Sequence, residues 1–88
     1  MSEVSLEEFA RVVLTFVAKR SGADMATLHS DSEYIANGLL DSLGTMDLFL
    51  LVEEHFGVKF RLEAFDVQQA TTARRLYAQY VNAHHRLN

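Results

Sequence analysis

The sequence predicts an all-α fold, a small bundle of three main helices plus one short helix, with a long loop between helices 1 and 2. Apolar residues recur at three- and four-residue steps in three separate segments, the spacing that places them on one face of a helix. None of the 88 residues is a proline, so these helices can run uninterrupted. One strand-like alternation, at residues 58–60, is too short to build a sheet. The length is that of one small domain, residues 1–88.

The first predicted helix runs from about Leu6 to Arg20. Its apolar residues share one face, and they are Leu6, Phe9, Val13, Phe16 and Val17. Ser5 and Glu8 have the spacing of a capping box, in which each side chain can satisfy a free backbone N–H at the start of the helix. Gly22 suits the turn that ends the helix, because glycine readily takes the left-handed conformation found there.

A long connection follows, from about Ala23 to Leu40. It is longer than most loops in compact domains, so we expect it to pack on the core or to carry function. Its apolar anchors are Leu28, Tyr34, Ile35, Leu39 and Leu40. Gly38 marks a turn just before the next helix.

The C-terminal part of the chain predicts one short and one long helix. The segment Leu62–Phe65 could form one or two helical turns. The last main helix starts near Thr72 and runs to about Ala83, and Thr71 or Thr72 can cap it. Its apolar face consists of Ala73, Leu76, Tyr77, Tyr80 and Val81.

The second main helix, from about Ser42 to His55 and ended by Gly57, carries two apolar stripes. Successive helical residues are about 100° apart, which separates the two sets. The core stripe consists of Leu48, Phe49, Val52 and Phe56. The second stripe consists of Leu43, Met46 and Leu50, with Asp47 and Glu54 beside it and Glu53 on its other flank.

One stripe is enough to dock a helix in a small bundle, so the second stripe needs a second partner. The long loop could cover it, which would be a purely structural role. Alternatively, the stripe is a docking surface for another protein, ringed by carboxylates. The flexible thioether of Met46 suits such a surface, because it adapts to several partners. A partner helix with Arg or Lys around an apolar centre would match it.

Ser42 lies at the junction between the long loop and this helix. Asp41 is a good N-cap candidate, which would make Ser42 the first helical residue, with its hydroxyl facing solvent. A helix N-terminus stabilises an anion through its free N–H groups and its dipole, so a phosphodiester on Ser42 would be favoured there. The alternative is that Ser42 is only a cap or a neutral first-turn residue, and its position alone does not exclude this.

The residues around Ser42 carry a family resemblance. Asp41-Ser42-Leu43 is similar to the Asp-Ser-Leu motif that acyl and peptidyl carrier proteins place at the start of their second helix. The continuation Gly44-Thr45-Met46-Asp47-Leu48, the later stretch Glu53-Glu54-His55-Phe56-Gly57-Val58 and the Thr71-Thr72 helix start are also family-like. The chain resembles this phosphopantetheine-binding family over nearly its whole length.

The resemblance implies that Ser42 receives a covalent 4′-phosphopantetheine arm from coenzyme A. A separate phosphopantetheinyl transferase would attach the arm and would recognise Asp41. The face on which the family's partner enzymes dock corresponds to Leu43, Met46, Asp47, Leu50 and Glu54. The chain is then expected to be a monomeric carrier-protein domain and not an enzyme, holding an acyl or aminoacyl group as a thioester. The implied partners are a loading ligase or acyltransferase and downstream synthase or transferase enzymes.

Two positions narrow the resemblance. Leu40 and Gly44 stand where bacterial fatty-acid carriers usually have an alanine and an acidic residue. The stretch from Gly38 to Thr45 looks more like D-alanyl and other aminoacyl carriers, or stand-alone carriers of secondary metabolism. The resemblance therefore implies a specialised pathway rather than housekeeping fatty-acid synthesis.

Other functional classes fit the sequence less well. A helical interaction adaptor without a prosthetic group would use the same second stripe, with Ser42 as a cap. A hydrolase is disfavoured because the chain has no Gly-x-Ser-x-Gly motif and little room for a substrate pocket. Glu53 and Glu54 are adjacent and diverge, so we interpret them as solvated residues and not as an acid–base pair. The histidines show no metal-ligand spacing, and cysteine is absent. The histidines are His29, His55, His84 and His85.

Charge and hydropathy bear on the expected partners and location. The formal net charge of -4 argues against a nucleic-acid binder, which must neutralise phosphates. No apolar run approaches the roughly 20 residues of a membrane-spanning helix. The first residues include Glu3, Glu7 and Glu8 where a signal peptide would carry Lys or Arg. We therefore expect a cytoplasmic protein with no membrane span.

Overall fold

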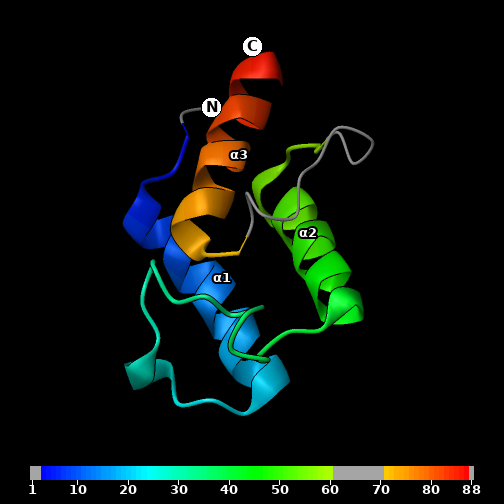
Figure 1. The fold of residues 1–88 in the computed structure, drawn as a ribbon. Coiled ribbons are helices and arrows are strands. Elements are labelled where there is room, and N and C mark those ends of the chain that lie inside the picture. Colours follow the sequence, from blue (N-terminus) through cyan, green and yellow to red (C-terminus); the bar gives the residue numbers. More distant parts are fainter. Residues whose placement is uncertain (1–2, 61–70, 88) are drawn as a thin grey trace.

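The computed structural model describes residues 3–60 and 71–87. These residues form helices and loops and contain no strand, which confirms the predicted all-α class (Figure 1). The elements in order are α1 (Leu6–Ser21), the short 3₁₀ helix η1 (Met25–Thr27), α2 (Ser42–Phe56) and α3 (Ala73–Leu87). The short helix predicted at Leu62–Phe65 lies outside the described residues. No helix in the described part of the chain is long and apolar enough to cross a membrane.

The ends of α1 are those that the sequence predicts. Ser5 accepts a hydrogen bond at its Oγ from the Glu8 N–H, at 3.2 Å. Gly22 takes a left-handed conformation with φ of 79° and donates its N–H to the Ala18 carbonyl at 2.8 Å. Ser5 therefore satisfies one free N–H at the start of α1, and Gly22 satisfies one free carbonyl at its end.

The last helix starts where the sequence predicts but ends later. It begins at Ala73, because Thr72 is the cap and accepts the Arg75 N–H at its Oγ1, at 3.1 Å. It continues past Ala83 to Leu87. No glycine or proline follows Ala83 to break the helix, and basic residues near a helix C-terminus favour its continuation.

Phe9 of α1 is the centre of the hydrophobic core and is fully buried. Its ring lies 5.1 Å from the ring of Phe56 in α2, and 5.4 Å and 5.1 Å from those of Tyr77 and Tyr80 in α3, between centroids. One aromatic side chain of α1 thus contacts both α2 and α3. The hydroxyls of Tyr77 and Tyr80 also bind the backbone of Val4, which fixes the N-terminal segment on α3.

The long loop packs on the core, as predicted. Tyr34 is fully buried, and this burial raises the pKa of its hydroxyl above the ordinary value. The Tyr34 carbonyl accepts hydrogen bonds from the N–H groups of Leu39 and Leu40, at 2.8 and 3.1 Å. Leu40 is itself buried in the core. These contacts fix the backbone that leads directly into α2.

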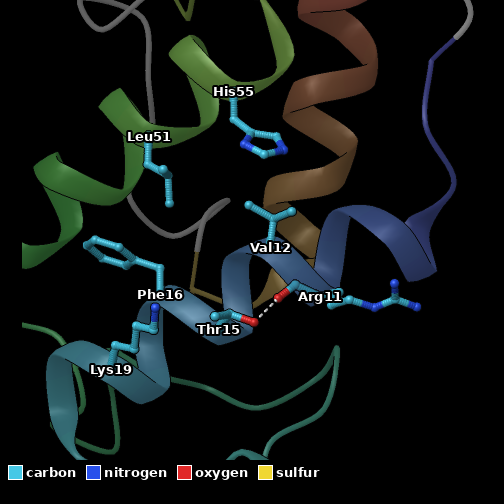
Figure 2. A pocket seen from close by; sticks show the side chains of 7 residues that line it. All are labelled: Arg11, Val12, Thr15, Phe16, Lys19, Leu51 and His55. Carbon is cyan, nitrogen blue, oxygen red and sulfur yellow. Dashed lines mark hydrogen bonds between the residues drawn. The ribbon is translucent and has the colours of Figure 1, made fainter.

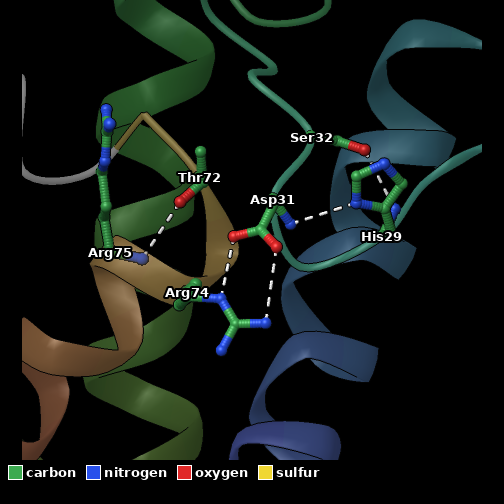
Figure 3. A network of polar contacts seen from close by, with 6 residues as sticks. All are labelled: His29, Asp31, Ser32, Thr72, Arg74 and Arg75. Carbon is green, nitrogen blue, oxygen red and sulfur yellow. Dashed lines mark hydrogen bonds and ion pairs between the residues drawn. The ribbon is translucent and has the colours of Figure 1, made fainter.

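The first half of the loop is attached to the start of α3 (Figure 3). The Arg74 guanidinium donates to the Asp31 carboxylate at 2.8 Å, and the Arg74 backbone N–H donates to the Ser30 carbonyl at 2.9 Å. The hydrogen bond from Arg74 lowers the pKa of the Asp31 carboxyl. His29 accepts the Asp31 N–H at its Nδ1, at 3.2 Å. The loop is therefore held near its middle by α3 and in its last part by the core.

Replacing Phe9 tests whether this residue joins the helices. Phe9→Ala removes a buried ring of α1 that contacts α2 and α3, so we expect the free energy of unfolding to fall by about 3–5 kcal/mol. Urea denaturation followed by circular dichroism measures the change. The control is Leu43→Ala, an exposed position at which the loss should stay below about 0.5 kcal/mol. A similar small loss for both variants would contradict the assigned core.

Candidate functional site

The junction that precedes α2 places Ser42 at the first position of the helix. Asp41 is the N-cap, with an extended backbone, and its Oδ1 accepts the Gly44 N–H at 2.7 Å. The Asp41 carbonyl accepts both the N–H and the hydroxyl of Thr45, at 2.9 and 2.8 Å. The predicted N-cap is confirmed, and the alternative that Ser42 caps the helix is wrong. The Ser42 hydroxyl has no hydrogen-bond partner among the described residues, and the residue is exposed.

Gly44 supports this cap in a way that sequence reasoning missed. A Cβ at this position would lie 3.2 Å from Asp41 Oδ1 and 3.2 Å from Leu40 Cδ2. A side chain would therefore press on the capping carboxylate and on the leucine that fixes the loop in the core. In the sequence, Gly44 stood out only as a departure from fatty-acid carriers. Gly44 has an ordinary helical backbone, so nothing in the neighbouring sequence indicates that a side chain here would be too close to Asp41 and Leu40.

The surroundings of Ser42 fit a phosphodiester-linked arm. Asp41 uses the Gly44 N–H, which leaves the N–H groups of Ser42 and Leu43 without an intrahelical partner. Such groups, together with the helix dipole, favour a phosphate. Ser42 also borders a mostly apolar cavity of about 350 Å³. The other lining residues are Ile35, Leu40, Asp41, Thr45, Met46 and Phe49.

The two predicted stripes of α2 lie as expected. In the core stripe, Leu48 and Val52 are fully buried. In the second stripe, the exposed fractions are 66% for Leu43, 42% for Met46 and 53% for Leu50. The alternative that the long loop covers the second stripe is therefore wrong. The loop packs elsewhere, on the core and on α3.

The three acidic residues near the second stripe have different environments. Asp47 is half-buried and accepts a hydrogen bond from Arg20 of α1, at 2.7 Å. Glu54 is exposed. Glu53 is half-buried, and its Oε2 accepts the Phe60 N–H at 2.8 Å. The interpretation of Glu53 as a solvated residue is therefore wrong, because its carboxylate binds the backbone of the segment that follows α2.

The histidines take part in local polar contacts. His29 binds the loop backbone, and His85 contacts Glu3 with 3.1 Å between Nε2 and Oε2. Over residues 3–60 and 71–87, no group of three or more His, Cys, Asp or Glu residues is arranged to hold a metal ion.

Comparison with known proteins gives consistent matches. No protein-family model matches the chain. It is 34% identical over 71 residues to the D-alanyl carrier protein of Lacticaseibacillus casei, covering 81% of this chain and 88% of that protein. It is 34% identical over 65 residues to the D-alanyl carrier protein of Bacillus velezensis, with coverages of 74% and 83%. The D-alanyl carrier protein of Bacillus licheniformis is 29% identical over 72 residues, with coverages of 82% and 92%.

Removing the Asp41 carboxylate tests the cap. Asp41→Ala leaves the Gly44 N–H without its acceptor, so we expect a loss of about 1 kcal/mol in the free energy of unfolding. Asp41→Asn keeps an accepting oxygen and should cost only a few tenths of a kcal/mol, roughly. Ser42→Ala should change stability by less than about 0.5 kcal/mol, because this hydroxyl caps nothing. Urea denaturation of the three variants would contradict the assignment if Ser42→Ala were the most damaging.

Proposed function

Because the chain belongs to the family of stand-alone carrier proteins that includes the D-alanyl carrier proteins, we propose that Ser42 is its attachment point for 4′-phosphopantetheine. Members of this family carry an aminoacyl group on that covalent prosthetic group. The arm supplies the terminal thiol that holds the cargo as a thioester. The observation that carries the proposal is that Asp41, and not Ser42, caps α2.

The cap separates the role of Asp41 from that of Ser42. Asp41 holds the first turn of α2, because its carboxylate accepts the Gly44 N–H. Ser42 offers an exposed hydroxyl with no base bonded to it among the described residues. Its oxygen forms the new bond to phosphorus, the nucleotide part of coenzyme A leaves, and the proton must go to a base of the transferase. We therefore propose that a separate transferase supplies this base and attaches the arm.

The second stripe of α2 is the proposed docking face for that transferase and for the enzymes that load and unload the cargo. Leu43 follows Ser42 directly, so a partner seated on Leu43, Met46 and Leu50 would have the attachment point beside it. Asp47 and Glu54 border the same surface. Basic residues around an apolar patch on the partner would complement it.

We further propose D-alanine as the cargo and the cytoplasm as the place of loading. The names of the similar proteins support D-alanine. The apolar cavity beside Ser42 gives no support for this cargo, because a group as small as D-alanine does not need to be enclosed there. The domain proposed to carry the arm spans residues 1–88.

Intact-mass analysis tests the attachment site. After incubation with coenzyme A and a broad-specificity phosphopantetheinyl transferase, the chain should gain the mass of one phosphopantetheine group. Ser42→Ala should gain nothing, while Ser21→Ala, at another exposed serine, should gain the full mass. A gain that survives Ser42→Ala would refute the assignment. No gain for the parent chain would favour the adaptor without a prosthetic group, which would use the same exposed stripe.

Two methionines of similar exposure test the docking face. Met46 in the second stripe is 42% exposed, and Met25 in η1 is 39% exposed. If the stripe contacts the transferase, Met46→Ala should raise the KM for the chain about five- to tenfold, the loss of a moderate interface contact. Met25→Ala should leave the KM unchanged. Equal effects of the two substitutions would show that the transferase docks elsewhere.

A further inference from the structure

A second apolar surface lies between α1 and α2, apart from Ser42. It is an open groove of about 420 Å³. Its floor is formed by the half-buried side chains of Val12, Phe16 and Leu51. In Figure 2, Leu51 and His55 point from α2 toward Val12 and Phe16 of α1. Phe16 and Leu51 pack against the core on one side and border the groove on the other, so their remaining exposed surface is available to another molecule.

The α1 wall of the groove is basic. Arg11, Thr15 and Lys19 are four residues apart in succession, so they form one exposed ridge along α1. Arg11 and Lys19 are drawn at opposite ends of the groove in Figure 2. Neither contacts a carboxylate in the described part of the chain, whereas Arg20 binds Asp47. Two cations without a partner therefore flank an apolar floor, on a chain whose formal net charge is -4.

The groove is separate from the stripe that is proposed to face carrier-protein enzymes. Successive residues of α2 are about 100° apart, which places Leu51 and His55 on a different side from Leu43 and Leu50. The carboxylates of Asp47 and Glu54 lie between the two surfaces. A partner in the groove would leave the second stripe of α2 open.

We propose that this groove binds an amphipathic helix of a partner protein, with carboxylates along one edge. Its apolar ridge would pack on Val12, Phe16 and Leu51, as helices do in hydrophobic grooves. Its carboxylates would pair with Arg11 and Lys19, which lie about 12 Å apart along the helix axis. Acidic residues seven or eight positions apart on the partner match this spacing.

The charge distribution favours a protein helix over an anionic membrane. A flat, negatively charged surface would meet a chain of net charge -4, and this repulsion opposes binding. A helix can enter the groove and place its charges at the two basic positions alone. The proposal is independent of the prosthetic group, because none of the residues that it uses borders Ser42.

Thr15 offers a matched pair of test variants. It is exposed between Arg11 and Lys19, and its hydroxyl bonds the Arg11 carbonyl of its own helix, at 2.6 Å. Thr15→Glu places a carboxylate four residues from each cation, so it competes for both cations and lowers the positive charge of the ridge. Thr15→Gln has nearly the same shape and adds no charge. Neither substitution touches the core.

The probes are two synthetic helical peptides with the same leucine ridge. One carries glutamates at two edge positions eight residues apart, and the other carries lysines there. Each is titrated into the full-length, ¹⁵N-labelled chain and followed by nuclear magnetic resonance. The glutamate peptide should shift amide resonances of residues 11–19, Leu51 and His55. Thr15→Glu should weaken its binding about tenfold, whereas Thr15→Gln and Ser42→Ala should bind it as the parent chain does.

Several outcomes would overturn the proposal. The lysine peptide could bind as tightly as the glutamate peptide or more tightly, or the glutamate peptide could bind Thr15→Glu as it binds the parent chain. The glutamate peptide could also shift only the resonances of the stripe of Leu43, Met46 and Leu50, or fail to bind at about 1 mM. Groove shifts caused by phosphatidylglycerol vesicles but not by the peptide would assign it to a membrane. Groove shifts that depend on protein concentration alone would assign it to a second copy of the chain. A failed mass gain at Ser42 would leave the groove unaffected, so the two proposals fail separately.

Discussion

The hydrogen bond from the Gly44 N–H to Asp41 Oδ1, at 2.7 Å, determines where α2 begins and therefore what Ser42 can do. With Asp41 as the cap, the Ser42 hydroxyl is left exposed at the first helical position. On the other side of the cap, Leu40 is buried in the core and its N–H is bound to Tyr34. The proposed attachment position on the surface thus directly follows a buried, hydrogen-bonded residue.

The same start of α2 fixes the direction of every side chain along the helix. Leu48 and Val52 are directed into the core, and Leu43 and Leu50 are then necessarily directed into solvent. A carrier domain has to be recognised by several enzymes in turn, and an exposed apolar stripe beside the proposed attachment point suits that task. The ion pair between Asp47 and Arg20 lies at the border of this stripe, and it separates the stripe from the groove between α1 and α2.

Local patterns in the sequence predicted the three main helices, the Asp41 cap and the two stripes of α2, because each depends on residues close together in the chain. Other features depend on contacts between distant segments. Examples are the bond from Arg74 to Asp31 and the groove between α1 and α2. Two further features are local in sequence but depend on how the chain turns or packs, namely the bond from Phe60 to Glu53 and the close contact of Gly44 with Leu40. No periodicity marks such contacts. The wrong interpretation of Glu53 as a solvated residue has this origin.

The most direct test of the central claim is to locate the modification in the protein as cells make it. Tandem mass spectrometry of the digested, natively expressed chain would identify which serine of residues 21–59 is modified. The structure predicts phosphopantetheine on Ser42 and on no other serine of that segment. An unmodified Ser42, or an arm attached to Ser21, Ser30 or Ser32, would contradict it.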